Sequence, residues 1–159
     1  MKPRRLEQNL TLTWNSGRGL AVRGAEIFAV DTENIALVVL NRNSGKVIRS
    51  IDVGMRPEQV VIDPAGNAFV TVRHGRSLVR INAGADTVSV SAEVGTEPFG
   101  VALSAAADVL YVTVTGDNKV VVLDPNDLAL LHTFNGFDRP QAIASNGQGK
   151  LAVTVRGTH

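Results

Sequence analysis

The apolar positions of this chain fall in short runs that are rich in β-branched side chains. In residues 59–94 these runs are QVVID, AFVTV, SLVRIN and TVSVSAEV, and the segments DPAGN, RHGR and AGAD separate them. Runs of this kind, bounded by Pro, Gly and Asp, predict strands joined by tight turns. No stretch keeps helical spacing over the length of a helix. The pattern therefore predicts an all-β chain.

The same pattern returns at a fixed interval along the chain. The segment FVTV at 69–72 corresponds to YVTV at 111–114, an offset of 42 positions. FAV at 28–30 precedes the first of these segments by 41 positions, and AVTV at 152–155 follows the second by 41. Four strands in a period of this length are typical of β-propeller blades, whereas helical and leucine-rich repeats do not fit. We predict an all-β β-propeller of four-stranded antiparallel blades with a 41–42-residue repeat.

The repeat divides the chain into blades within one partial domain. Complete blades are expected at about 20–53, 57–94 and 98–135, with half a blade at 140–157. Residues 6–12 align with the last strand of a blade and are expected to form an orphan outer strand. Such a layout leaves apolar blade flanks open, and open flanks drive association. The expected partners are a second copy of the chain, with a dimer favoured, or further blades of a longer protein.

The third copy of the repeat resembles a known family. Its segments PFGVALS at 98–104, LYVT at 110–113 and VVVLD at 120–124 are similar to the YVTN β-propeller repeat, and the similarity extends over nearly the whole chain. The chain departs from that repeat at two turns, SAAAD and SNGQG, and it keeps the Asn of the motif nowhere. The resemblance implies a propeller, typically seven-bladed, from outside the cytoplasm.

Composition narrows the classes of partner. The 159 residues include 16 basic and 15 acidic side chains and no cysteine. A net charge near zero gives no electrostatic footprint for nucleic acid or an anionic membrane, so neither is expected as a partner. No apolar run is long enough to span a bilayer, and the first residues lack the apolar core of an export signal. Apart from the resemblance, the compartment stays open.

The sharpest candidate site is a cluster of basic residues in two loops. In a propeller blade, the loop that enters the first strand and the loop between the second and third strands lie on one face. Guanidinium groups there could bind a carboxylate or phosphate ligand. The alternative is a solvated loop whose arginines pair with Glu58 and Glu97. The predicted anion-binding residues are Arg56, Arg73, His74, Arg76 and Arg139.

Other candidates are weaker. His74 could ligate a metal or haem, but the chain has only three histidines and none at ligand spacing, so neither a metal nor a cofactor is expected. No nucleophile elbow is present, so no catalytic residue is assigned. The segment DPND at 124–127 could bind calcium or simply form a turn. The aromatic residues could stack on a ligand or plug the space between blades; they are Trp14, Phe99 and Phe137.

Three functions remain open on the sequence alone, and the third of them is a half-propeller whose only activity is self-assembly. A repeat rich in structural residues and poor in catalytic ones favours a non-catalytic binding or scaffold module that self-assembles and presents a loop face. The alternative is the propeller part of a larger extracytoplasmic lyase or cytochrome-linked redox protein. The second function would need blades or a haem-binding domain beyond this sequence.

Overall fold

The computed structural model describes residues 19–146 and 148–157. The orphan strand predicted at 6–12 and Trp14 therefore lie outside the described residues. Fourteen strands and one 3-10 turn, η1 (Thr115–Asp117), make up the regular structure of this part of the chain. Blade 1 contains β1 (Leu20–Arg23), β2 (Glu26–Asp31), β3 (Ala36–Asn41) and β4 (Val47–Asp52); blade 2 contains β5 (Pro57–Ile62), β6 (Ala68–Val72), β7 (Ser77–Ile81) and β8 (Val90–Glu93). Blade 3 contains β9 (Pro98–Leu103), β10 (Leu110–Val114), β11 (Lys119–Leu123) and β12 (Leu130–Asn135), and the half-blade contains β13 (Pro140–Ser145) and β14 (Leu151–Val155).

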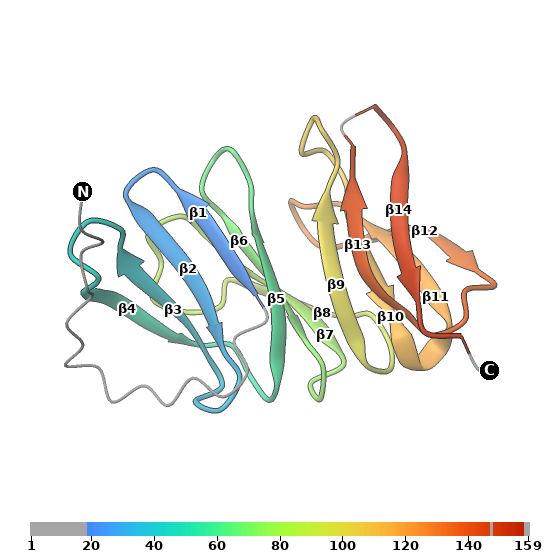
Figure 1. Cartoon of the computed structure of the whole chain (residues 1–159), viewed down its shortest axis with the longest axis horizontal. Helices are drawn as coiled ribbons and strands as arrows, with labels where there is room; N and C mark the ends of the chain where they lie inside the picture. Colours follow the sequence, from blue (N-terminus) through green and yellow to red (C-terminus); the bar gives the residue numbers. More distant parts are fainter. Residues whose placement is uncertain (1–18, 147, 158–159) are drawn as a thin grey trace, which may run out of the picture.

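Each complete blade is an antiparallel sheet in which consecutive strands are neighbours. The strand order is β1-β2-β3-β4 in blade 1, and blades 2 and 3 repeat it. Figure 1 shows the sheets following one another along the molecule, from blade 1 at one end to blade 3 and the half-blade at the other. The predicted fold class, four-stranded blades recurring at the repeat interval, is confirmed. The sheets do not close a ring among the described residues.

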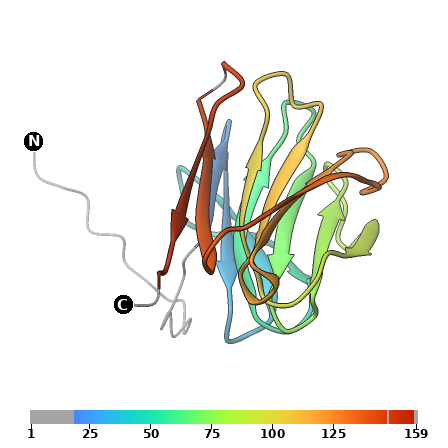
Figure 2. The same cartoon turned by 90° about the vertical axis from the view of Figure 1, so that its right-hand side faces the viewer.

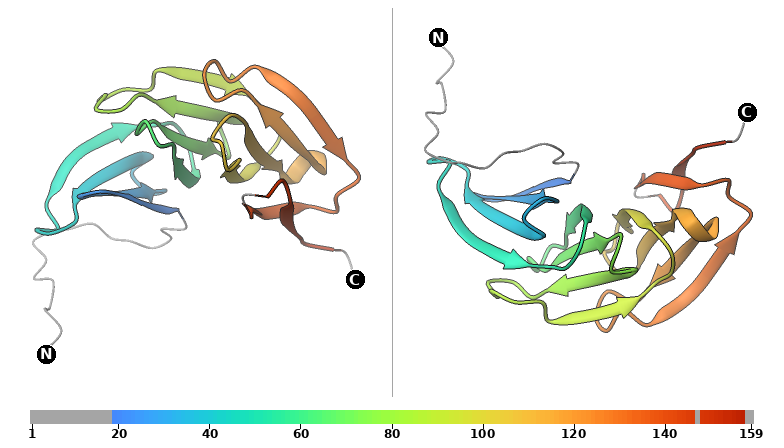
Figure 3. Two further views of the ribbon diagram at one scale, coloured as in Figure 1. Left: turned by 90° about the horizontal axis from the view of Figure 1, so that it is seen from above. Right: turned by 90° about the horizontal axis from the view of Figure 1, so that it is seen from below.

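The blades form an open arc. Viewed along the longest axis of the molecule, the sheets stand one behind another (Figure 2). Viewed from above and below, the first strand of each blade lies on the inner side of the arc and the last strand on the outer side (Figure 3). This radial stacking covers both faces of an internal blade, which explains why its strands read as continuous apolar runs.

The core is divided among the blade junctions. Side chains of blades 1 and 2 form one apolar cluster, those of blades 2 and 3 a second, and those of blade 3 and the half-blade a third. Within β6, Val70 and Val72 belong to the first cluster and Phe69 to the second. Because successive side chains of a strand point to opposite faces, one short strand supplies two junctions.

Threonine hydroxyls connect neighbouring blades. Thr71 in β6 donates to the carbonyl of Phe99 in β9 at 2.7 Å, and the equivalent Thr113 in β10 donates to the carbonyl of Gln141 in β13. Thr113 is fully buried, and its oxygen also accepts the Gly100 N–H at 2.7 Å. A β-branched residue that bonds both to its own blade and to the next therefore fixes the stacking of the inner strands.

The outer strand of blade 2 is shorter than its sequence pattern predicts. A strand was expected over 87–94, whereas β8 covers only Val90–Glu93. The Asn82 N–H donates to the Ser89 hydroxyl at 3.0 Å, and the Ser89 N–H donates to the Arg80 carbonyl at 2.8 Å. A local side-chain bond thus replaces the regular ladder before Val90.

Blade 3 leaves part of one face uncovered. Ile51, Ala92 and Phe134 occupy the same repeat position on the face that meets the following blade. Ile51 is 2% exposed beneath blade 2, whereas Phe134 is 44% exposed, because the half-blade supplies only two strands to cover it. His132 packs edge-on against Phe134, with ring centroids 4.5 Å apart.

Candidate functional site

Two sets of loops meet on one end of the blades, as the sequence predicts. The Arg73 N–H donates to the Arg56 carbonyl at 2.9 Å, and the His74 N–H donates to the Met55 carbonyl at 3.2 Å. These bonds join the loop after β6 to the loop that enters β5. One repeat later, Thr115 N–H donates to the Glu97 carbonyl at 3.0 Å. We call this end of the blades the loop face.

The arginines nearest each other on the loop face share one buried carboxylate. The Glu58 side chain is only 4% exposed, and its Oε1 lies 3.4 Å from Arg56 Nε and 3.6 Å from Arg73 Nη1. Arg73 Nη2 also lies 2.9 Å from Glu97 Oε1. The pairing with Glu58 and Glu97 that the alternative interpretation describes is therefore present. The protein's own carboxylates therefore neutralise much of the positive charge that was expected to bind an anion.

The remaining predicted site residues point elsewhere. Arg76 pairs through Nε with Glu93 Oε1 on β8 at 3.2 Å, and His74 is exposed to solvent. Arg139 belongs to the loop that enters the half-blade, where its N–H donates to Asn118 Oδ1 at 3.0 Å. The structure thus brings Arg56 and Arg73 together and separates Arg76 and Arg139 from them. The anion site stays a prediction.

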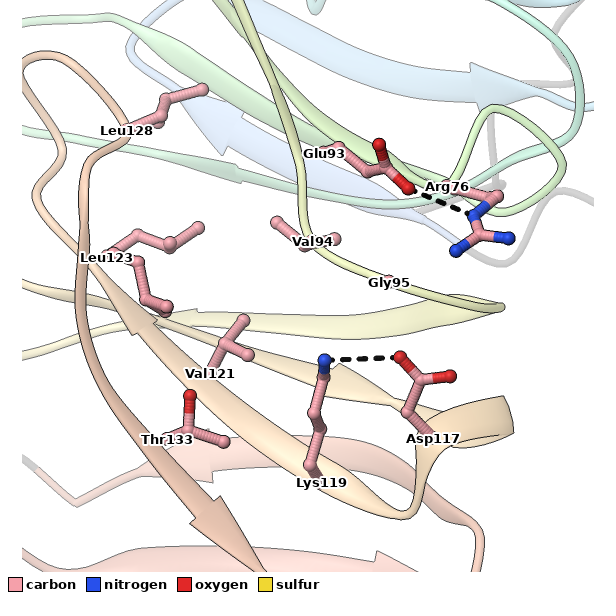
Figure 4. Close-up of a pocket in the computed structure, with 11 residues that line it drawn as sticks. Arg76, Glu93, Val94, Gly95, Asp117, Lys119, Val121, Leu123, Leu128 and Thr133 are labelled. Atoms are coloured by element: carbon pink, nitrogen blue, oxygen red, sulfur yellow. Dashed lines mark ion pairs between the residues drawn. The ribbon is translucent and has the colours of Figure 1, made fainter.

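A cleft of about 430 Å³ opens between blades 2 and 3 (Figure 4). Pockets that bind small molecules have volumes of roughly 300–1,000 Å³ and combine an apolar lining with a few polar groups. The volume of this cleft falls in that range, and polar residues line as much of it as apolar ones. Its floor is apolar, its outer wall comes from β12, and its charged rim lies toward the loop face. The floor consists of Val94, Val121, Leu123 and Leu128, the wall of Leu130 and Thr133, and the rim of Arg76, Glu93, Asp117 and Lys119.

The cleft forms where the repeat changes to smaller side chains. On the outer strand of blade 1, Arg49 and Ile51 face blade 2, and Ile51 is buried there. The residues 41 positions later, on β8 and facing blade 3, are Val90 and Ala92. Both are smaller, and β8 is two residues shorter than β4. Less side-chain volume at the outer edge of this junction leaves the space open.

The charged rim contains a well-anchored carboxylate. Asp117 Oδ2 accepts the Thr96 N–H at 3.2 Å and lies 3.1 Å from Lys119 Nζ. Burial raises the pKa of Asp117, but hydrogen bonds from the Thr96 hydroxyl and N–H, together with Lys119, outweigh burial and lower the pKa below its ordinary value of 3.8. Asp117 is therefore ionised at neutral pH, and it holds Lys119 in place.

Gly95 makes the close approach at the rim possible. A Cβ at this position would lie 2.2 Å from Asp117 Oδ2, 2.9 Å from Val114 Cγ1 and 3.1 Å from Lys119 Nζ. Its φ of +125° is also a backbone conformation that residues other than glycine rarely adopt. A side chain here would displace the ion pair and obstruct the cleft.

Of the cleft residues, only Arg76 is among the predicted site residues. The sequence also places Asp117 and Lys119 in a loop of the loop face, and the remaining cleft residues read as ordinary strand and turn residues. The smaller Val90 and Ala92 in place of Arg49 and Ile51 are the one signal in the repeat that marks this junction as different.

The weaker candidates also have structural counterparts. In the segment DPND, Asp124 Oδ1 accepts the Asn126 N–H at 2.7 Å and Asp127 Oδ1 accepts the Ala129 N–H at 2.9 Å, so both carboxylates form the turn. Phe137 packs between blade 3 and the half-blade, and Phe99 is buried. Both positions agree with the plug interpretation.

Two further features are absent from the described residues. No three His, Cys, Asp or Glu side chains in the part of the chain that the structure describes lie close enough to hold a metal ion. The same part of the chain has no helix with the length and apolar character needed to cross a membrane.

The blades, their radial stacking and their meander topology define the chain as a β-propeller. No family model matches the sequence, and no curated protein matches it either. Hydrazine synthase from Kuenenia stuttgartiensis has a similar structure, with a TM-score of 0.83 and 16% identity over 96% of this chain and 45% of that chain. The β-propeller domain of Myceliophteria thermophila Cps50 (Swd1) has a TM-score of 0.72 and 13% identity over 86% of this chain and 49% of that chain. The chain thus spans about half the length of these structures, and the likeness concerns the fold alone.

Proposed function

We propose that this β-propeller chain is a non-catalytic binding module and that the cleft between blades 2 and 3 is its ligand site. The observation that carries the proposal is the combination of an apolar floor, which includes Val121 and Leu123, with charged pairs at one end. An apolar floor supplies affinity, and a few placed polar groups supply orientation.

The state of the ionisable groups supports binding rather than proton transfer. A general acid or base needs a pKa near the working pH and a geometry that lets it exchange a proton. Asp117 has a lowered pKa and is fixed by Thr96 and Lys119. Glu58 is buried between two guanidinium groups. These residues form a rigid charged frame.

Amide chemical shifts of the isotope-labelled chain test this proposal directly. Small apolar and amphipathic fragments, added in mixtures, should shift the amide signals of Gly95, Lys119 and Val121 at the cleft. Thr133→Phe should abolish these shifts, because Thr133 lines the cleft and an aromatic ring would fill it. The matched control is Ser91→Phe, the equivalent exposed position one repeat earlier, which should bind as the original chain does. Fragment binding only elsewhere, or binding that survives Thr133→Phe, would contradict the proposal.

Self-association, expected from the sequence, is part of the proposed scaffold role. It is supported by the exposed apolar face of blade 3 around Phe134, because Ile51, at the equivalent position of blade 1, is buried. Light scattering on a sizing column measures the mass, and Phe134→Ser should shift the population toward the monomer. A monomer at all concentrations would remove this part of the proposal and leave the ligand site untouched.

A further inference from the structure

The cationic side chains at the rim of the cleft keep unused hydrogen-bond donors. Arg76 contacts Glu93 through Nε, and among the described residues neither of its Nη groups has an acceptor. Lys119 contacts Asp117 through one side of its ammonium group. Guanidinium and ammonium groups carry several N–H donors, so both side chains can bind a further acceptor without breaking their existing pairs.

The carboxylates at the rim are less available. Asp117 already accepts the Thr96 N–H and contacts Lys119 Nζ, both through Oδ2. The side chains of Glu93 and Arg76 are 71% and 55% exposed, so water screens both charges of this pair and competes somewhat more for the carboxylate. The rim therefore offers more free donors than free acceptors, although its formal charges cancel. This imbalance favours an anionic group of the ligand over a cationic one.

The two cationic groups lie on either side of Gly95. The Gly95 N–H approaches the Arg76 carbonyl at 3.4 Å, and Lys119 Nζ lies within 3.1 Å of where a Gly95 Cβ would stand. In Figure 4 the ends of both side chains are directed toward the cleft, while Val94, Val121 and Leu123 lie deeper along it. Arg76 and Lys119 both line the cleft, so a carboxylate at its rim would meet donors from blades 2 and 3, and its attached apolar body would lie on the floor.

We propose that the cleft binds a ligand whose apolar body ends in a carboxylate held by Arg76 and Lys119. This inference rests on the proposed function and specifies the ligand class of the same site. Two sources share this chemistry: a free organic acid, and the C-terminus of a peptide with apolar residues.

A matched series of probes tests the charge preference. Hexanoate, hexanamide and hexylamine have the same chain length and differ in the head group. Hexanoate should bind at least about tenfold more tightly than hexanamide, because charge-assisted hydrogen bonds are worth this much, and hexylamine should bind most weakly. A second arm compares acetyl-Ala-Leu-Leu with a free and with an amidated C-terminus. Tighter binding of the free peptide than of hexanoate would identify a peptide C-terminus as the ligand, and tighter binding of hexanoate would identify a free organic acid.

Variants assign the preference to the two residues. Arg76→Gln should reduce the advantage of hexanoate over hexanamide by about tenfold. The double variant Asp117→Asn/Lys119→Gln should do the same, and it avoids an unpaired aspartate. Arg42→Gln makes the same change in net charge as Arg76→Gln at an exposed site on blade 1 and should have no effect.

The outcomes separate this inference from the proposed function. If hexanamide binds in the cleft as well as hexanoate, or if the Arg76 and Lys119 variants keep the full preference, the ligand class is wrong and the binding module stands. If no probe binds at the cleft and fragments also fail to bind there, both are wrong.

Discussion

Replacing Thr113 with valine tests whether threonine hydroxyls hold the blades together. Valine keeps the β-branched shape and removes only the hydroxyl. In the structure this oxygen accepts the Gly100 N–H at 2.7 Å within blade 3 and donates to the Gln141 carbonyl of the half-blade. Thr113 is 0% exposed, so water cannot replace either bond without a rearrangement of the junction.

The expected loss follows from these two bonds. A buried N–H without a partner costs about 1–3 kcal/mol, and a typical intramolecular hydrogen bond contributes about 0.5–1.5 kcal/mol. We expect the free energy of unfolding to fall by about 2–4 kcal/mol, which is a large part of the roughly 5–15 kcal/mol that stabilises a typical domain. In urea unfolding, the midpoint should fall by about 1–2 M for a denaturant slope near 2 kcal/mol/M.

A matched variant and a local probe make the test specific. Thr154 stands at the same repeat position in the half-blade and accepts the Ala142 N–H at 2.9 Å, but it is exposed. Thr154→Val should therefore change the unfolding free energy by no more than about 0.5 kcal/mol. Hydrogen exchange of the Gly100 N–H should become faster in Thr113→Val alone. Equal effects of the two substitutions, or unchanged exchange at Gly100, would refute the reasoning.

Four further substitutions test the ion pairs and the close approach at Gly95. Arg73→Ala should lower the unfolding free energy by about 1–3 kcal/mol because it leaves buried Glu58 with one partner, whereas Arg76→Ala should cost less than about 1 kcal/mol because its pair is exposed; equal losses in urea unfolding would contradict this. Gly95→Ala should cost about 1–3 kcal/mol, because a non-glycine residue is strained at this φ, and a thermal midpoint like that of the original chain would count against the expected clash between the added Cβ and Asp117. Asp117→Asn should destabilise the chain at neutral pH. Because the pKa of Asp117 is lowered in the folded chain, the difference in unfolding free energy between the two chains should persist above the ordinary pKa of 3.8 and vanish as the pH falls through the folded pKa. A difference that grows in acid would contradict the assigned direction of the pKa shift.

Much of the fold could be predicted because its determinants are local. The β-branched runs predict strands, and the copies of FVTV and YVTV give the repeat interval. The alternation of Phe69 and Val70 between two junctions follows from the geometry of any strand. The short β8 departs from its pattern because the hydroxyl of Ser89 competes with the ladder, and such competition is hard to see in a strand-like sequence.

The loop backbone shows a second limit of sequence reasoning. Arg56, Glu97 and Arg139 occupy equivalent loop positions and have φ of 60°, 56° and 50°. Glycine or asparagine is the usual sequence signal for this left-handed conformation, and these three positions hold neither. Their conformation is stabilised by bonds between loops that are distant in the sequence, such as the bond from the Arg73 N–H to the Arg56 carbonyl.

The sequence by itself determined the all-β class, the four-stranded blade and its repeat, because strand propensity, turn residues and alternation act over a few neighbouring positions. It also identified the basic residues of the loop face. The tertiary structure decided what those residues do: Arg73 meets Glu97 across a blade junction, and Arg76 turns to the cleft instead. The cleft depends on the small Ala92, which leaves space at the junction of blades 2 and 3. At the junction of blades 1 and 2 the larger Ile51 fills the equivalent space. Such volume differences have meaning only once the packing of one blade on the next is known.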